Sequence, residues 1–521
     1  MGRQFHASRI LIPGLAAAML VIAAHPAMAG VSQGGGPVTS GHAVKRSSDT
    51  HAVAPAGKHA RTVVTFAWGG GWANQMQALP IFREYGMHAV YFIPSGLVCT
   101  RSKSQCASSS PYLTLSDIHA IASYGNEIGG LSVLHQDLTQ VSPAEAKREI
   151  CDDRGNLFRW GFRPTDFAYP FAAEDPGLEN LTRQCGYNAG LGAGELRGDG
   201  LCRTCAWAET IPPPDPMLVR APVEVNSVKT DWSVRTYQSI VEGAEKHGGG
   251  WIFFTLHDYC AKTCGLGITG PQLRKVLAWL RTQARHNVRV ETMRQVIGGP
   301  VQPAVAGPAP HPVPPPGVVN SRLLRTAGKS ASPACFRQVD YGKNDASFTY
   351  HPTGGPGGSA AETVRVTRWV SGGAKLLPDM DLGACAPAVS PGQRYTVGAW
   401  YKSSQPTQLD VYYRNRVGDW LYWTTSPAFP ATDSWQRAAW TTPAVPAAAT
   451  AMSFGLTADS NITVTSTAYS IAPAKDRRAM VLLGLLLFIL VAAALIARGQ
   501  IRYRKYIRAE IAADEHPGVS A

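Results

Sequence analysis

Before residue 300, continuous apolar runs alternate with segments whose apolar residues recur at helical spacing. The strand-like runs are 62–66, 89–93, 127–133, 167–169 and 251–256, and the helix-like segments are 75–85, 114–124, 143–158 and 271–284. In the segment 114–124, Thr114 is the expected N-cap and Asp117 lies in the first turn. Repeated strand–helix units with continuous apolar strands predict a parallel sheet covered by helices, either open or closed into a barrel.

After residue 317 the pattern is that of an all-β domain. Short runs of alternating apolar and polar residues follow one another, with turn residues between them. The clearest runs are 346–350, 363–367, 395–400, 409–414 and 435–440. They predict an antiparallel β-sandwich over 318–473, of the jelly-roll type. The expected fold class is therefore α/β over 61–299, followed by an all-β domain.

Two segments without an apolar period flank the α/β domain. Residues 30–60 are rich in Gly, Ser, Ala and His, which predicts a flexible leader. The segment 300–317 contains eight prolines. Because proline at this density favours an extended polyproline conformation, we expect a stiff spacer between the two domains.

Both ends of the chain contain apolar runs with basic flanks. Residues 1–29 combine a basic start, an apolar run and an Ala-x-Ala site, which is typical of a cleaved signal peptide rather than a membrane anchor. Residues 479–497 contain neither charge nor proline, and a helix of that length spans about 28 Å, close to the hydrocarbon thickness of a bilayer. The basic tail 498–521 follows. We therefore expect one transmembrane helix in the cell membrane, with the bulk of the chain extracellular and the C-terminus cytoplasmic.

Composition narrows the class of partner. Lys and Arg number 49 against 36 Asp and Glu, which gives a formal net charge of +13. This surplus favours an anionic surface such as a cell wall or lipid headgroups. No basic stripe with interleaved aromatic residues is present, so nucleic acid is not an expected partner. With 45% hydrophobic and 16% charged residues, the chain can build packed cores.

The chain contains ten cysteines, a number that fits an exported protein. Eight precede residue 300 and two, Cys335 and Cys385, follow it, so each half has an even number. Close pairs such as 99/106 and 260/264 favour local disulfides. Cys202-x-x-Cys205 has other interpretations, as half of a zinc ribbon or as a redox motif. Because no second CxxC accompanies it, a disulfide is the favoured interpretation.

Aromatic residues are concentrated in the expected sandwich. They are Trp400, Tyr401, Tyr412, Tyr413, Trp420, Tyr422, Trp423, Trp435 and Trp440. Some of them must belong to the core. Tyr422 and Trp423 are adjacent in one expected strand, so their side chains point to opposite faces. At least one of the two is therefore off the core face, where its ring could stack on a sugar.

Four short motifs occur in order along the α/β domain. They are Thr65-Phe66 followed by a Gly-containing turn, Asn126 to Leu138 with His135, Phe167-Ala-Tyr-Pro-Phe171, and Trp251 to Leu256 followed by His257 and Asp258. In this order and spacing they resemble the motifs of the NodB-type polysaccharide deacetylases, a family of metal-dependent carbohydrate esterases. The resemblance covers about residues 61–300. It implies a distorted (β/α) barrel with its chemistry at the C-terminal ends of the strands.

The resemblance also implies a chemistry that this sequence only partly supports. In that family one Asp and two His hold a divalent metal, commonly zinc, a second Asp is the general base, and a His protonates the leaving amine. The two aspartates follow the first strand, where this chain has Ala67 and Trp68. Leu131 occupies the first His position, so His135 is the only retained metal-ligand position. No bound cofactor is therefore expected, and a divalent metal such as zinc is expected only if the domain is active.

His257 and Asp258 occupy the place of the family's general acid and are the remaining candidates for a catalytic role. A His at a strand end more often has an ordinary hydrogen-bonded role in the fold. Trp68 and Trp72, with three glycines between them, are expected to line the barrel mouth. There they would either bind a sugar or fill the space of the missing metal site.

Three functions are consistent with these residues. The first is a membrane-anchored extracellular protein that binds N-acetylated cell-wall glycans through a deacetylase-like barrel whose catalysis is impaired. The second is an active metal-dependent hydrolase of acetamide C–N bonds in polysaccharide, and the third is a surface spacer or interaction module. The first accounts together for the aromatic residues, the expected anchor and the missing ligands. Its expected partners are cell-wall or extracellular polysaccharide and the membrane.

Overall fold

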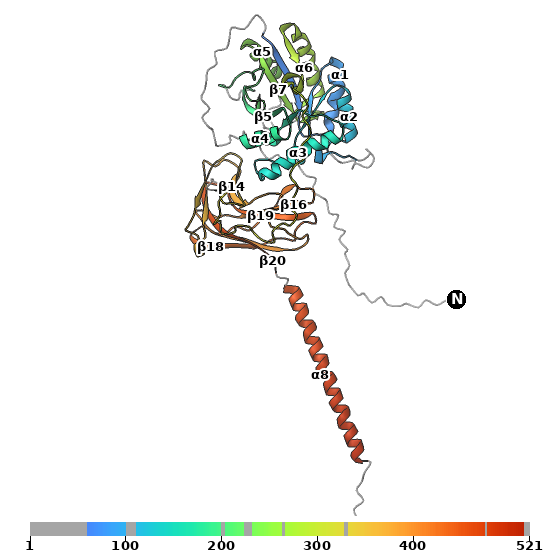
Figure 1. Ribbon diagram of the computed structural model, residues 1–521, viewed down its shortest axis with the longest axis vertical. Coiled ribbons are helices and arrows are strands. Elements are labelled where there is room, and N and C mark those ends of the chain that lie inside the picture. The colour runs from blue at the N-terminus through green and yellow to red at the C-terminus, as the bar shows by residue number, and fades with distance from the viewer. Residues whose placement is uncertain are drawn as a thin grey trace, which may run out of the picture.

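The computed structural model describes residues 60–100, 111–198, 204–222, 232–262, 266–327, 332–474 and 477–514. Figure 1 shows an α/β domain, an antiparallel β domain packed against one side of it, and the C-terminal helix α8 (Arg477–Asp514). The expected signal peptide and nearly all of the expected leader lie outside the described residues.

The first domain is built on one parallel sheet. Its strands are β1 (Thr62–Trp68), β2 (Val90–Ile93), β3 (Glu127–Gly130), β4 (Asp166–Ala168), β5 (Ala189–Leu196), β6 (Val219–Pro222), β7 (Gly250–Leu256) and β10 (Val288–Val290). Their order is β10-β1-β2-β3-β4-β5-β6, and β7 pairs with β1. The Glu209 backbone exchanges hydrogen bonds of 2.7 and 2.9 Å with Trp251 in β7, while its carboxylate binds Arg220 in β6 at 2.7 Å. This segment therefore joins β6 to β7 across the opening of the curved sheet.

Helices cover the outer face of this sheet (Figure 1). They are α1 (Leu79–Tyr85), α2 (Leu115–Ser123), α3 (Pro143–Arg159), α4 (Pro176–Gln184), α5 (Val234–Lys246), α6 (Gly270–Gln283) and α7 (Met293–Ile297), and two short strands, β8 (Asp258–Cys260) and β9 (Gly267–Thr269), follow β7. The side chains of β1 alternate between two apolar clusters, because successive residues of a strand point to opposite faces. Phe66 and Trp68 pack in the cluster formed with the helices, whereas Val63 and Ala67 pack in a cluster on the other face.

The predicted strand–helix alternation is confirmed where the local signals are strong. Thr114 is the N-cap of α2: its hydroxyl accepts a hydrogen bond from the Asp117 N–H at 3.2 Å, and the Asp117 carboxylate accepts one from the Thr114 N–H at 3.0 Å. This reciprocal pair satisfies two N–H groups that would otherwise lack partners. Pro80 lies in the first turn of α1, where its missing N–H costs nothing.

The second domain consists of two five-stranded antiparallel sheets. Its strands are β11 (Phe336–Tyr341), β12 (Asp345–His351), β13 (Ala361–Thr367), β14 (Gly373–Pro378), β15 (Tyr395–Ser403), β16 (Leu409–Asn415), β17 (Trp420–Thr425), β18 (Thr432–Thr441), β19 (Ala449–Ala458) and β20 (Ile462–Pro473). One sheet has the order β11-β14-β19-β16-β17 and the other β12-β13-β20-β15-β18. The chain crosses between the sheets at most connections, as expected for a jelly roll.

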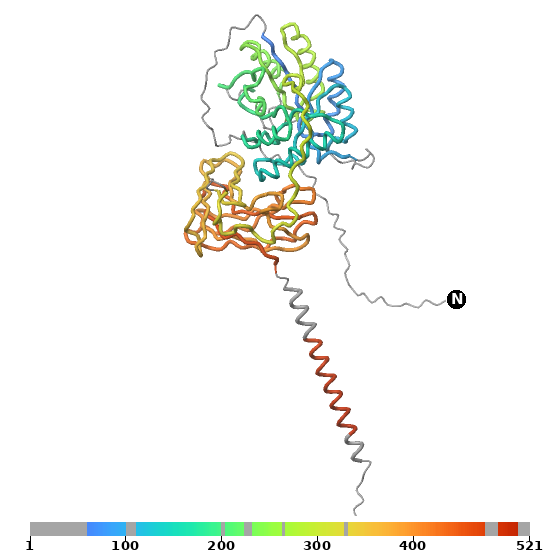
Figure 2. Tube along the Cα trace, viewed as in Figure 1, coloured from blue at the N-terminus to red at the C-terminus, as the bar shows by residue number. Residues whose placement is uncertain are grey.

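The segment 300–317 is extended, but it is bound to both domains rather than free. Arg154, which is fully buried in α3, donates to the carbonyls of Gln302 and Pro303 at 2.7 and 2.8 Å. Further on, Pro315 accepts a backbone hydrogen bond of 2.8 Å from Ala388 of the sandwich. Figure 2 shows the chain passing along the first domain into the second. These contacts tie the extended segment to both domains.

Two disulfides join described cysteines, Cys151 with Cys185 and Cys335 with Cys385. Cys99, Cys205 and Cys260 are disulfide-bonded as well. The preference for a disulfide over a zinc site at Cys205 is therefore confirmed. Residues 106, 202 and 264, the partners expected from the sequence, lie outside the described residues.

No helix in the part of the chain covered by the structure is long and apolar enough to cross a membrane. The first half of the predicted span, residues 479–487, lies outside the residues whose side chains are described.

Candidate functional site

The site lies where β1 and β7 end, at a turn that only glycine can form. Gly70 and Gly71 have φ values of +87° and +63°. A Cβ on Gly70 would lie 2.5 Å from the indole nitrogen of Trp72, so a side chain at this position would collide with that ring. The turn is tied to β7 by Gln75, which is fully buried and donates to the carbonyl oxygens of Gly69 at 2.7 Å and His257 at 2.8 Å.

Two histidines meet at this end of the sheet. His257 follows β7, and its Nε2 would lie 3.3 Å from a Cβ on Gly69, so the glycine turn lies directly against the imidazole. Burial, with a further contribution from the neighbouring His257, lowers the pKa of His135 to about 4. Burial also lowers the pKa of His257, against the opposing effect of Asp258. Both imidazoles are therefore neutral at neutral pH, when each ring carries one N–H and one lone-pair nitrogen.

Phe171 provides an exposed aromatic surface beside these histidines. Its side chain is 56% exposed, and its ring centroid lies 4.8 Å from that of His135 at an interplanar angle of 71°. The residue has a φ of +59°, a backbone conformation that non-glycine residues rarely adopt. Phe171 lies in one of the four sequence motifs, but the motif alone predicts no role for its ring. The signal that could have identified it is a large aromatic residue after Pro170, just beyond the C-terminal end of β4.

Asp258 lies next to His257, and its carboxylate is held by Asn74. Its Oδ1 accepts a hydrogen bond of 2.7 Å from the side-chain amide of Asn74. The other nitrogen of the neighbouring imidazole, His257 Nδ1, is buried and has no hydrogen-bond partner among the described residues. The structure therefore brings His135, His257 and Asp258 to one end of the sheet, and it leaves one buried imidazole nitrogen unpaired there.

The two tryptophans of the first motif have different environments. Trp68 is fully buried and stacks on Tyr91 with the ring centroids 6.1 Å apart. It packs between the sheet and the helices, so it does not line the mouth as the sequence led us to expect. Trp72 is half-buried and stacks on Tyr112 at 4.8 Å, beside the glycine turn. Only Trp72 of this pair is near the candidate site.

Carboxylates near the mouth are engaged in hydrogen bonds that hold the fold. Asp137 accepts from the hydroxyl and N–H of Thr139, and Asp175 caps α4. In α3, Asp153 is fully buried and accepts from the Ser95 N–H at 2.9 Å and the Leu131 N–H at 3.1 Å. Its neighbour Asp152 points elsewhere and accepts from Gly307, as the divergence of adjacent helical positions predicts.

The residues present do not fit the metal that the family uses. Ala67, Trp68 and Leu131 offer no ligand atom, which leaves His135 as the one family position with a donor. Across the described ranges, no three or more His, Cys, Asp or Glu residues are grouped so that they could hold a metal ion. A catalytic zinc site in a protein has three protein ligands. The donor set at the mouth therefore falls short of a zinc centre.

In the sandwich, Tyr422 and Trp423 point to opposite faces, as predicted. Tyr422 is 58% exposed. Trp423 packs against the sandwich core and meets the Tyr413 ring edge-on at 6.4 Å. Of the two, only Tyr422 presents its ring to solvent.

Comparison with known proteins gives one family match and several distant structural neighbours. Residues 56–190 match the polysaccharide deacetylase family, and no protein with a curated description matches the chain significantly. The Xyl-CE4 domain of a multidomain xylanase from the hindgut metagenome of Trinervitermes trinervoides is 17% identical, with 45% of this chain and 89% of that chain covered and a TM-score of 0.30. The peptidoglycan deacetylase PdaC from Bacillus subtilis is 18% identical, with 45% and 90% covered and a TM-score of 0.27. A family 4 acetyl xylan esterase from Clostridium thermocellum, in complex with a cobalt ion, is 16% identical, with 47% and 96% covered and a TM-score of 0.30.

The family match, the parallel sheet and the order of the motifs all concern the same part of the chain. Residues 56–190 therefore match the polysaccharide deacetylase family, and an antiparallel β-sandwich lies further along the same chain.

Proposed function

We propose that this protein binds N-acetylated cell-wall glycans through a polysaccharide deacetylase domain whose catalysis is impaired. One observation carries the proposal. The strand-end positions that supply metal ligands and the base in the family are Ala67, Trp68 and Leu131, whereas the mouth retains His135, His257 and an exposed Phe171. These groups can bind a sugar, but they lack the two carboxylates that hold the metal and act as the base in the family.

Hydrolysis of an acetamide needs a base for the attacking water and an acid for the leaving amine. The position of the base is occupied by an alanine or a tryptophan, neither of which accepts a proton. His257 is at the place of the acid, but its lowered pKa keeps the imidazole neutral at neutral pH, when a general acid must be protonated. Both halves of the proton transfer are therefore weakened.

The same groups suit recognition of a neutral sugar. The exposed ring of Phe171 offers a flat apolar surface for the C–H face of a pyranose, and aromatic rings combine such packing with defined geometry. Neutral imidazoles at His135 and His257 can each donate one hydrogen bond and accept one from hydroxyl or acetamide groups.

The location of the protein is part of this proposal and rests on the sequence. The layout of residues 1–29 supports export, and the uncharged run 479–497 supports a single-pass anchor with the two domains outside the cell. Protease treatment of intact cells tests the topology. Degradation of both domains with a protected C-terminal tag is expected, and a protected barrel domain would contradict it.

The function is tested with full-length protein purified in detergent, by retention on insoluble peptidoglycan and by release of acetate from chitohexaose. We expect retention without acetate, and Phe171→Ala should weaken retention. Tyr124→Ala is the matched control, because this tyrosine is 41% exposed at the C-cap of α2 and the variant should bind as wild type does. Acetate release that His135→Ala abolishes would show an active hydrolase instead. If the protein is not retained on peptidoglycan and releases no acetate, the role of a surface spacer remains.

A further inference from the structure

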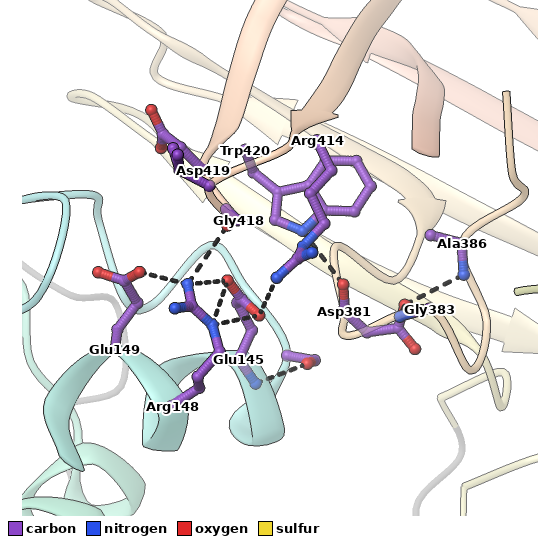
Figure 3. Close-up of polar contacts among 12 residues, drawn as sticks. Glu145, Arg148, Glu149, Asp381, Gly383, Ala386, Arg414, Gly418, Asp419 and Trp420 are labelled. Atoms are coloured by element: carbon purple, nitrogen blue, oxygen red, sulfur yellow. Dashed lines mark hydrogen bonds and ion pairs between the residues drawn. The ribbon is translucent and has the colours of Figure 1, made fainter. Parts of the chain in front are cut away.

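The two domains share a buried interface that includes ion pairs. Arg148 in α3 donates to Glu145 at 2.7 Å, to Glu149 at 2.5 Å and to the carbonyl of Gly418 in the sandwich at 3.3 Å. Arg414 reaches from the sandwich to Glu145 at 3.3 Å, and Figure 3 shows the two arginines on either side of this carboxylate. Apolar residues of both domains pack in one cluster, which includes Leu138, Ile150, Val339, Leu377, Met380, Trp420 and Ala451.

The sandwich also holds the segment that follows His135. Arg337 in β11 donates to the carbonyl of Thr139 at 3.0 Å, and Gln140 donates to the carbonyl of Asp340 at 3.1 Å. The N-cap Ser142 of α3 donates its N–H to the Met380 carbonyl at 3.1 Å. The edge of the sandwich sheet at β11 therefore lies directly beside the loop that carries His135.

The face of the sheet that packs on the first domain continues beyond the interface. In β16 and β17, Arg414 and Trp420 form the cross-strand pair at the interface. Tyr412 and Tyr422 form the next pair on the same face, with ring centroids 5.7 Å apart. On β11, Val339 belongs to the interface cluster and Tyr341, two residues on and therefore on the same face, is 44% exposed.

A buried lysine connects these tyrosines across the sheet. Lys375 in β14 is fully buried, and its ammonium lies 5.2 Å from the centroid of the Tyr341 ring and 5.4 Å from that of Tyr412. It forms an ion pair of 2.5 Å with Asp410 and donates to the Tyr412 hydroxyl at 3.1 Å. We call Tyr341, Lys375, Tyr412 and Tyr422 the tyrosine row. It crosses the sheet from one edge to the other.

The tyrosine row is fixed in position and carries no net charge. Thr425 donates to Asp410 at 2.7 Å and shares a hydrogen bond with the Tyr422 hydroxyl, so the exposed ring is held by the same ion pair that anchors Lys375. The positive charge of Lys375 is balanced by Asp410. Rigid aromatic rings around a neutral polar group are suited to an uncharged ligand, because little conformational freedom is lost on binding.

We propose that the tyrosine row is a second glycan-binding surface, continuous with the mouth of the deacetylase domain. A single uncharged, N-acetylated glycan chain would lie across Tyr422 and Tyr341, pass the loop 135–140 and reach Phe171. One glycan chain can contact both surfaces, because the tyrosine row begins at the domain interface and β11, at its edge, is hydrogen-bonded to the loop that follows His135. The proposal rests on the proposed function and adds to it the length of glycan that the protein recognises.

The test is a pair of calorimetric titrations of the full-length protein with chitobiose and with chitohexaose. Tyr341→Ala and Tyr422→Ala should each weaken chitohexaose binding about three- to tenfold and leave chitobiose binding unchanged, because only the longer chain reaches the row. Tyr422→Phe keeps the ring and should bind nearly as wild type does. Tyr124→Ala is again the control, and Phe171→Ala should weaken the binding of both ligands.

The outcomes separate the two proposals. Suppose that Tyr341→Ala and Tyr422→Ala bind chitohexaose as tightly as Tyr124→Ala does, whereas Phe171→Ala binds it weakly. Glycan binding by the tyrosine row is then refuted and the proposed function stands. If the wild-type protein binds neither ligand, the proposed function fails and the row fails with it. Tyr341 contacts the buried Lys375 and Tyr422 is hydrogen-bonded to Thr425, so truncation of either tyrosine also removes a contact within the fold. A thermal melt of each variant therefore verifies that lost binding is not lost folding.

Discussion

Replacing Arg148 with alanine is expected to destabilise the protein far more than loss of a surface arginine would. The Arg148 side chain is 9% exposed and that of Glu145 is fully buried. Removing the guanidinium leaves Glu145 and Glu149 buried with Arg414 as the remaining nearby cation of this cluster. Breaking a buried ion pair from one side costs about 3–5 kcal/mol, because the other charge is left without compensation.

The measurement is guanidinium-induced unfolding of wild type, Arg148→Ala and a matched control. Arg235→Ala is that control, because Arg235 forms an ion pair with Glu242 on α5 while its side chain is 68% exposed. Pairs of this kind contribute about 0–1 kcal/mol. Arg148→Lys should lie between wild type and Arg148→Ala, since a lysine keeps the charge but not the planar fork. A loss for Arg148→Ala no larger than that for Arg235→Ala would refute the view that this cluster holds the domains together.

Three other predictions concern pH and the glycine turn. Burial, together with Glu149 and Glu145, raises the pKa of Asp419 from 3.8 to about 7, so the folded protein favours the protonated carboxyl. The contribution of Asp419 to stability should therefore fall as pH rises from about 4 to about 7. Asp419→Asn should reduce the change of melting temperature with pH over that range, and an unchanged dependence would contradict this. The pKa of His135 is lowered to about 4, so its ring proton signals in NMR spectra should titrate far below the ordinary value of 6.5. The contribution of His135 to stability should fall as pH drops from 6.5 towards 4. A titration midpoint near 6.5 would mean that the ring is not buried as described. Gly70→Ala should destabilise the protein by about 1–3 kcal/mol, because Gly70 has a positive φ and an added Cβ would contact Trp72. Gly161 also has a positive φ but no neighbour within 4 Å of an added Cβ, so Gly161→Ala should lose less stability. Equal losses of stability would exclude the contact with Trp72 as the cause.

The elements with strong local signals could be predicted from sequence, and the orientation of a buried side chain could not. Thr114 and Asp117 fix the start of α2 through their own hydrogen bonds, so four consecutive residues of sequence contain the whole cause. The strand β1 is buried on both faces, and a continuous apolar run does not say which residues face the helices. For that reason Trp68 was expected at the mouth, whereas it packs against Tyr91 in the core.

Contacts between segments that are distant in the chain could not be predicted from the sequence pattern. Proline content predicts that residues 300–317 are extended, but their binding to Arg154 depends on backbone carbonyls, which every residue has. The interface depends on Leu377 and Val339, in strands that the alternating pattern did not reveal. At the candidate site, the sequence identified His135, His257 and Asp258 through the resemblance, while the exposure of Phe171 became visible only in the fold.

The central claim is that the mouth of the deacetylase domain lacks the donors for a catalytic metal. The most direct measurement is the metal content of the purified full-length protein after it is incubated with excess zinc and dialysed. Because a catalytic zinc requires three protein ligands, we expect less than about 0.1 equivalent of zinc per chain, and the same value for His135→Ala. One equivalent of zinc in the wild type that is lost in His135→Ala would contradict the account.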